Sequence, residues 1–214
     1  IPGEATDSGS QSSATTFGPT LKFKLAIEGR PETDYSAKAV FVGLAAGSPT
    51  TKPTYLLTFS VDLPESGVYS GLSLAGLTSG SSYTAYLKGS GQIDKAVSFT
   101  MGENETSLSS GTAIDLISGD LNEDNQVSSA DQTVVSSLYG TNSNSSNWNP
   151  NADFNADGVI NNFDLNYVTK NLGKIGDSGI WVSVPSPGGP SGAVEGAQTE
   201  GMWIWVPNDH LYKP

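Results

Sequence analysis

The chain has 214 residues, of which 15% are charged, and its net charge of −12 disfavours a nucleic-acid partner or adsorption to an anionic membrane surface. It has no cysteine, so disulfides and thiolate–zinc sites are excluded. With one histidine, His210, and no cysteine, it lacks most of the residues that Ser-His-Asp and Cys-His catalytic sites are built from. No stretch approaches the roughly 18 consecutive apolar residues of a membrane-spanning helix.

A Ser/Thr/Gly-rich arm (residues 1–17) precedes a region with β character. Apolar residues alternate with other side chains from Leu21 to Ile27, which is typical of a half-buried strand. Further β-rich runs follow at residues 39–45, 55–61, 68–74, 82–87 and 95–101. Gly, Pro and Ser clusters separate these runs, which favours an antiparallel β-sandwich. We therefore predict a β-sandwich domain over residues 18–117.

Turn motifs in this region resemble those of the carboxypeptidase-regulatory-like, or prealbumin-like, β-sandwich modules of exported proteins. The motifs lie at residues 59–71 (FSVDLPESGVYSG), 77–86 (LTSGSSYTAY) and 97–99 (VSF). The resemblance implies a non-catalytic spacer or adhesion unit and carries no catalytic residue onto this chain. A glycosidase would need two carboxylates facing each other across a cleft, and the acids of this region fall in expected turns, so we expect no enzyme.

Two acidic segments, residues 120–131 and 153–164, share the ligand spacing of an EF-hand calcium loop. Oxygen-bearing side chains stand at loop positions 1, 3, 5, 9 and 12 of both, and position 7 adds a backbone carbonyl. Calcium is a hard cation that takes six to eight oxygen ligands, which a looping chain supplies at alternate residues. The predicted ligands of two Ca²⁺ ions are Asp120, Asn122, Asp124, Gln126, Ser128 and Asp131, and then Asp153, Asn155, Asp157, Val159, Asn161 and Asp164.

A short amphipathic segment follows each loop, at residues 131–138 and 164–172. Their i, i+3/i+4 and i+7 spacing predicts helices with one apolar stripe, and a glycine suited to a helix C-cap, Gly140 or Gly173, ends each. The repeated unit of one loop and one helix resembles a dockerin, the duplicated calcium-binding module that docks onto cohesin domains. Residues 118–174 carry this resemblance, which implies a structural role for both calcium ions.

The sequence departs from the dockerin pattern at particular loop positions. Asn125 stands at position 6 of the first loop, where glycine is usual, and because Asn tolerates left-handed backbone we expect only a modest weakening. Positions 10 and 11 of each loop help dockerins to recognise the cohesin, and the residues at these positions differ between the two loops. This difference disfavours the dual binding mode of some dockerins, in which either repeat can make the same contacts. The candidate cohesin-contact residues are Ser129, Ala130, Asn162 and Phe163.

The C-terminal arm, residues 175–214, contains two near-repeats, at residues 179–185 (GIWVSVP) and 201–207 (GMWIWVP). Burying a large apolar side chain stabilises by roughly 1.5–3 kcal/mol, so we expect these β-forming segments to cover a surface. They could add strands to this chain's own sandwich, be donated to a neighbouring copy, or serve as platforms for sugar rings. The candidate partner-contact residues are Trp181, Trp203 and Trp205.

These patterns together favour a non-enzymatic, extracellular calcium-binding protein of mainly β class with a small α module. A start at Ile1 rather than Met suggests that an export signal has been removed or lies outside the given sequence, and the sequons at Asn104 and Asn144 fit an exported, glycosylated protein. The leading hypothesis is a self-associating filament or surface-layer subunit joined by strand addition. The alternative is a dockerin-type module that docks to a cohesin scaffold in a polysaccharide-degrading or adhesion complex, with or without glycan binding.

Overall fold

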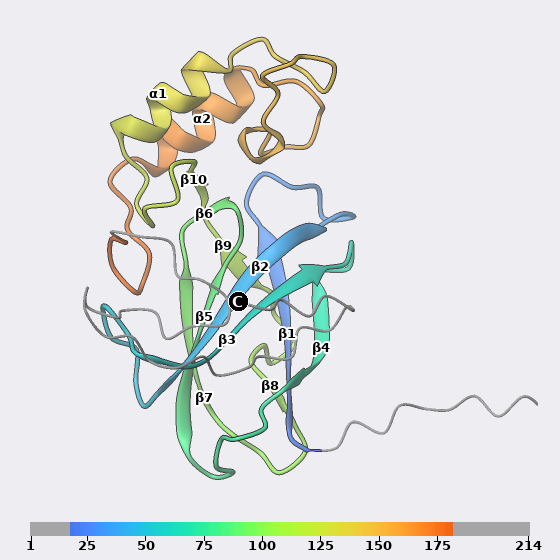
Figure 1. The fold of residues 1–214 in the computed structure, drawn as a ribbon. Helices are drawn as coiled ribbons and strands as arrows, with labels where there is room; N and C mark the ends of the chain where they lie inside the picture. The colour runs from blue at the N-terminus through green and yellow to red at the C-terminus, as the bar shows by residue number, and fades with distance from the viewer. Residues whose placement is uncertain (1–17, 182–214) are drawn as a thin grey trace, which may run out of the picture.

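The computed structural model describes residues 18–181, most of which form a β-sandwich (Figure 1). One sheet contains, in spatial order, β3 (Tyr55–Leu63), β2 (Ala37–Ala46), β5 (Ser82–Lys88) and β7 (Lys95–Thr100). The other sheet centres on β1 (Thr20–Ile27), which pairs with β4 (Val68–Ser73), β8 (Glu105–Ser107) and β9 (Ile114–Leu116). A small third sheet pairs β6 (Gly91–Gln92) with β10 (Ser118–Asp120).

The predicted mainly β class with a small α module is confirmed, and each predicted β run overlaps a strand of the sandwich. One sheet differs from the predicted antiparallel pairing, because β8 and β9 both run parallel to β1. Between β1 and β8 the chain passes to the other sheet for β2 and β3, returns for β4, and passes across again for β5 and β7.

The core of the sandwich lies between its two larger sheets. On β1 the side chains of Leu21, Phe23 and Leu25 are completely buried, whereas the intervening lysines are partly exposed. Val42 and Leu44 of β2 belong to the same hydrophobic cluster. A shift of β1 by one residue would exchange the buried and exposed sets, so this alternation fixes its register.

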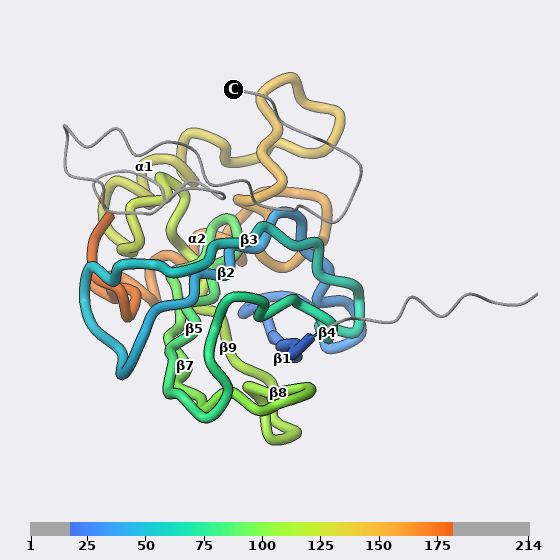
Figure 2. Tube along the Cα trace, turned by 60° about the horizontal axis from the view of Figure 1, so that its bottom comes forward, coloured from blue at the N-terminus to red at the C-terminus, as the bar shows by residue number. Residues whose placement is uncertain are grey.

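A helical module lies at one end of the sandwich and follows β10 directly (Figures 1 and 2). It contains α1 (Ser129–Ser137), the short 3-10 helix η1 (Pro150–Ala152) and α2 (Asn162–Asn171). Its own hydrophobic cluster contains the completely buried side chains of Val127, Val135, Ile160 and Val168. No helix within residues 18–181 is long and apolar enough to cross a membrane.

Each α-helix begins with a capping box made by the residues at loop positions 9 and 12. Ser128 caps α1 together with Asp131, and Asn161 caps α2 together with Asp164. Both helices therefore start two residues earlier than the amphipathic pattern predicts. Both helices also end one residue earlier, and Leu172, which the pattern places on the apolar stripe, is 42% exposed.

Candidate calcium loops and docking surface

The two acidic loops have the same backbone conformation. Glu123 and Ala156 at position 4 have φ values of 61° and 58°, and Asn125 and Gly158 at position 6 have φ values of 64° and 84°. Left-handed backbone is unfavourable for most residues, and glycine and asparagine tolerate it best. Its repetition at the same two positions shows that both loops are wound in the same way.

In each loop, side-chain oxygens of positions 1 and 3 converge on the backbone amide of position 5. The amide of Asp124 donates to Asp120 Oδ1 at 3.0 Å and to Asn122 Oδ1 at 3.1 Å. The amide of Asp157 donates to the equivalent oxygens of the second loop, both at 3.2 Å. Oxygens that share one donor lie close together, as ligands of a single cation must.

The carboxylate at position 12 joins the beginning of each loop to its end. Asp131 Oδ1 accepts hydrogen bonds from the amides of Leu121 and Asn122, and its Oδ2 accepts from the amide of Ser128. Asp164 accepts equivalent bonds in the second loop, and burial raises the pKa of its carboxyl group. Both Asp131 and Asp164 are completely buried, so the aspartate at position 12 lies inside each loop and joins its two ends.

The donor set of the loops fits calcium. Each predicted set contains carboxylate, amide and backbone oxygens, and the first adds a hydroxyl; neither includes sulfur or imidazole. Residues 18–181 contain no group of three or more His, Cys, Asp or Glu side chains that could by itself hold a metal ion. Coordination would therefore depend on the amide and backbone oxygens that stand between the carboxylates, as in other oxygen-lined calcium loops.

Position 8 of each loop connects the two repeats. The amide of Val127 donates to the carbonyl of Lys174 at 2.9 Å, and its carbonyl accepts from the amide of Gly173 at 2.8 Å. Ile160 makes the same pair of bonds with the residues that follow α1, including the amide of Gly140 at 2.8 Å. Each loop is thus held against the end of the helix from the other repeat, and the module is built as one symmetric pair.

A buried lysine breaks this symmetry by joining the first loop to the sandwich. Lys88 at the end of β5 is 3% exposed, and its Nζ donates to Asp120 Oδ2 at 2.8 Å and to Glu123 Oε2 at 2.7 Å. It also donates to the carbonyl of Gln92, and the ring of Trp181 lies over it with its centroid 5.4 Å from Nζ. Burial raises the pKa of Asp120 to about 6, an effect that the Lys88 ammonium opposes.

Asn125 connects the first loop to the sandwich and to the segment after α2. Its side chain accepts from the amide of Asp94 at 2.7 Å and donates to the carboxylate of the same residue at 2.8 Å. It also donates to Ser178 Oγ and to the carbonyl of Gly179 at 2.8 Å. Because a glycine at this position could make none of these bonds, the structure gives a physical reason for the departure from the usual residue.

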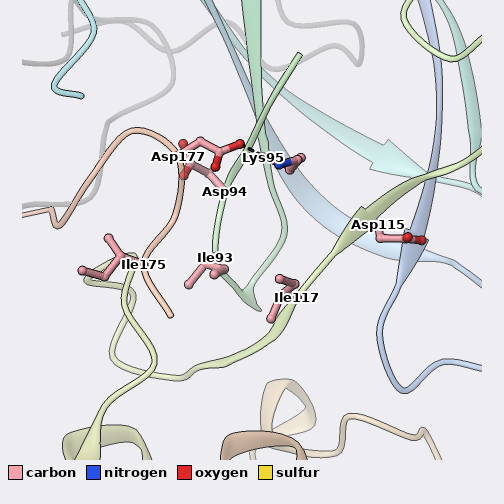
Figure 3. A pocket seen from close by; sticks show the side chains of 7 residues that line it. All are labelled: Ile93, Asp94, Lys95, Asp115, Ile117, Ile175 and Asp177. Atoms are coloured by element: carbon pink, nitrogen blue, oxygen red, sulfur yellow. Dashed lines mark ion pairs between the residues drawn. The ribbon is translucent and has the colours of Figure 1, made fainter. Parts of the chain in front are cut away.

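The contacts that Lys88 and Asn125 make between the first loop and the sandwich are called the joint, and a small pocket of about 50 Å³ lies beside them. Figure 3 shows the side chains that line this pocket. Asp94, Lys95 and Asp177 form much of its polar wall, and Lys95 Nζ lies 3.0 Å from Asp177 Oδ2. Burial raises the pKa of Asp94, whose Oδ2 has no hydrogen-bond partner among residues 18–181. The space suits a few water molecules rather than an organic ligand, so the pocket belongs to the joint.

Glu28, which follows β1, connects the sandwich to α2. Its Oε1 lies 2.7 Å from Lys170 Nζ, and its Oε2 accepts hydrogen bonds from the side chain of Asn171 and the amide of Ser118. Burial acts to raise the pKa of Glu28, but the hydrogen bonds from Lys170 and Asn171 outweigh it and lower the pKa. The sandwich and the helical module therefore share polar contacts at more than one point.

The predicted cohesin-contact residues lie at the N-terminal ends of the two helices. Ser129 and Ala130 are exposed at the start of α1, and Asn162 and Phe163 are exposed at the start of α2. Phe163 is 68% exposed, more than any other large hydrophobic side chain in residues 18–181. An aromatic ring left in water at a helix end is a candidate contact for another protein.

Residues 118–173 match the family model of the dockerin type I domain. The predicted dockerin module is thereby confirmed, with almost the predicted boundaries. The match covers the dockerin domain alone, and the prealbumin-like assignment of the sandwich stays a prediction.

The solved structures similar to this chain include complexes that contain a dockerin. A chain of a type II cohesin–X-dockerin complex from Acetivibrio cellulolyticus, an N-terminal interface mutant, has a TM-score of 0.54 at 17% identity, covering 74% of this chain and 97% of that one. A chain of the C-terminal interface mutant has a TM-score of 0.52 at 16% identity, covering 74% and 96%. No curated protein matches this chain. At these identities the likeness shows the fold alone.

Trp181 lies beyond the dockerin domain and packs on this chain's own sandwich. Its ring makes an edge contact with Phe41 at a centroid distance of 5.8 Å, and its Nε1 donates to Ser178 Oγ at 2.8 Å. Its amide donates to the carbonyl of Asp124 in the first loop at 2.7 Å. Trp181 thus packs on its own chain, but it lies in no strand, so strand addition by the arm stays a prediction.

Some predicted residues lie away from the dockerin domain or outside the described range. Asn104 in the sandwich is exposed, and so is the second sequon residue, Asn144, in the segment between the two calcium loops. The predicted N-terminal arm and the Trp203 and Trp205 segment fall outside the described residues. Glycosylation and the contacts of the distal tryptophans therefore stay predictions.

Proposed function

We propose that this chain is a cohesin-docking protein whose dockerin domain binds two calcium ions and attaches the chain to a cohesin-like domain of another protein outside the cell. The observation that carries this proposal is the dockerin type I match over residues 118–173, a region that contains two loops of the same conformation. No comparison supports the self-associating filament. Docking therefore replaces filament formation as the leading hypothesis.

Calcium has a structural role in this proposal. Asp120, Asp124 and Asp131 bring three negative charges into one short loop, and Asp153, Asp157 and Asp164 do the same in the other. When bound, Ca²⁺ would neutralise these charges and fix the residues that cap each helix. The ends of α1 and α2 would then be held in one orientation, ready for a partner.

The proposed partner surface lies at the starts of the two helices. Phe163 provides an exposed aromatic side chain at α2, whereas Ala130 offers only a methyl group at the matching position of α1. Aromatic side chains carry a large share of the binding energy in many protein interfaces. We infer one docking orientation, in which α2 supplies the main apolar contact.

We infer that the described part of the chain acts by binding rather than by catalysis. Its conspicuous polar side chains, such as Lys88, Asp94 and Glu28, are engaged in contacts between the sandwich and the dockerin domain. The low calcium affinity that is typical of extracellular modules suits a medium in which calcium is plentiful. The proposal therefore places the protein outside the cell, as a non-enzymatic component of an assembly.

The proposal is tested by binding the full chain to immobilised cohesin domains of type I and type II, in millimolar calcium. We expect tight binding to at least one of them and a loss of about thirtyfold in affinity for Phe163→Ser, equivalent to about 2 kcal/mol. Tyr139→Ser is the matched control, because Tyr139 is an aromatic residue of the same domain that is also exposed, at 51%. Equal losses for both variants, or no binding to either class, would contradict the proposal.

A further inference from the structure

The two calcium loops differ in what lies behind them. In the first loop the side chains at positions 4 and 6, Glu123 and Asn125, both reach the sandwich: Glu123 Oε1 accepts from the amide of Gly91 at 2.8 Å, and Asn125 bonds to Asp94. In the second loop the same positions are Ala156 and Gly158. A Cβ atom built on Gly158 would meet nothing within 4 Å, so that side of the second loop is open.

We propose that Lys88 acts as a built-in counter-cation of the first loop, so that this loop stays wound and docked on the sandwich without calcium, whereas the second loop needs calcium to keep its shape. The inference rests on the calcium binding proposed above and goes beyond it, because it assigns different calcium dependence to the two loops. It also makes Lys88, a residue of the sandwich, a positioning residue for a site in the dockerin domain.

The geometry lets Lys88 and a calcium ion act at the same time. Lys88 contacts Asp120 Oδ2, which also accepts from the amide of Asn125 at 2.9 Å. The other oxygen, Asp120 Oδ1, faces the amide of Asp124 together with the oxygen of Asn122, on the side where the predicted ligands converge. Lys88 thus binds one oxygen of the Asp120 carboxylate, Oδ2, and the other oxygen, Oδ1, can coordinate a calcium ion.

The charges of the two loops support the same conclusion. The first loop has the three aspartates of positions 1, 5 and 12 and, in addition, Glu123, whose charge is paired with Lys88. The second loop has the three aspartates of the same positions. Within residues 18–181, the ion pairs that involve a loop residue are the two that Lys88 makes with the first loop. Attraction between charges is stronger in a buried site than in water. The first loop is therefore compensated internally before any calcium binds.

The left-handed residues differ in their support as well. Glu123 and Asn125 have positive φ values, and each is held by hydrogen bonds from its side chain to the sandwich. Ala156 has the same conformation in the second loop, and its methyl side chain can make no such bond. Strained backbone persists only where its surroundings hold it in place. We therefore expect the second loop to relax when calcium is removed.

Amide hydrogen exchange on the full chain, in millimolar calcium and then in EGTA, tests this inference. We expect amides of residues 153–161 to lose protection by at least about tenfold in EGTA, while residues 120–128 change by less than about threefold. In Lys88→Met, the first loop should also lose protection in EGTA and recover it in calcium. Lys95→Met is the matched control, because it removes another ion pair of the same joint without touching a loop.

The outcomes separate this inference from the proposed function. If calcium protects neither loop, the proposed calcium binding fails. If calcium protects the second loop but the wild-type first loop loses protection equally in EGTA, the role of Lys88 is overturned alone. A Lys88→Met chain that folds only in calcium would support the inference, and if this variant folds in neither buffer, the wild-type comparison still decides.

Discussion

The ammonium of Lys88 lies 2.8 Å from the Oδ2 atom of Asp120, with side-chain exposures of 3% and 0%. This contact ties strand β5 of the sandwich to the first residue of the first calcium loop. Removing one partner of a buried ion pair leaves an uncompensated charge and destabilises strongly, whereas the intact pair contributes little by itself. The contact therefore makes the two parts of the chain depend on each other.

Asn125→Gly restores the residue that dockerins usually have at position 6, yet we expect it to destabilise the protein. The change removes the side-chain hydrogen bonds to Asp94, Ser178 and Gly179. It also raises the conformational entropy of the unfolded chain. The expected loss in free energy of unfolding is about 2 kcal/mol, measured by urea denaturation in calcium.

Gly158→Asn is the matched control for this substitution, because it places Asn at position 6 of the second loop. Its Cβ would meet nothing within 4 Å, and Asn tolerates a positive φ, so we expect a change below about 1 kcal/mol. Similar effects of the two changes would show that the joint at Asn125 is unimportant.

Gly29→Ala should weaken the packing of the dockerin domain against the sandwich. Gly29 has a φ of 98°, and a Cβ atom there would lie 2.7 Å from the carbonyl oxygen of Phe154, at the start of the second loop. We expect a loss of about 3 kcal/mol in free energy of unfolding, measured in urea. Gly47→Ala, at a φ of 75° with nothing within 4 Å, should cost only the backbone strain of about 1–2 kcal/mol.

The Glu28 contact with α2 should make stability depend on pH in the acid range. The pKa of Glu28 is below its ordinary value of 4.5, so the unfolded state binds more protons and this contribution is lost as pH falls below about 4.5. Melting temperatures of the wild type and of Glu28→Gln, measured from pH 3 to pH 6, should differ at the upper end and converge at the lower end. Parallel curves would contradict this prediction.

Trp181→Ala should loosen the segment after the dockerin domain. The change removes the ring contact with Phe41 and uncovers the Lys88 ammonium. We expect a loss of about 1–3 kcal/mol in free energy of unfolding, because the ring is only partly buried. Trp181→Phe should lose less, since an aromatic ring remains against Phe41 although the hydrogen bond to Ser178 is removed.

The loops and helices could be predicted from the sequence because their signals are local. Ligand spacing repeats within twelve residues, and an apolar stripe such as Val135 or Val168 recurs within one helix. The joint could not be predicted in this way. Lys88 meets Asp120 across 32 positions of sequence, and nothing marks a lysine at the end of a strand as buried. Asn125 was visible only as a departure from glycine, because its partner Asp94 is also remote in sequence.

The parallel pairing of β1 with β8 and β9 was likewise beyond local patterns. Strand β8 (Glu105–Ser107) and strand β9 (Ile114–Leu116) have three residues each, which is too short for alternation to be recognised. Their place in the sheet depends on how the chain crosses between the two layers. Sequence alone therefore predicts most strands and the sandwich class, but not which strands pair.

The most direct test of calcium-dependent docking is size-exclusion chromatography with light scattering, on the full chain mixed with a cohesin domain that binds it. In millimolar calcium we expect a complex of one chain with one cohesin, and a chain that stays monomeric when the cohesin is left out. In EDTA we expect the complex to dissociate. Large homopolymers in calcium without cohesin, or a complex that is unaffected by EDTA, would contradict calcium-dependent docking.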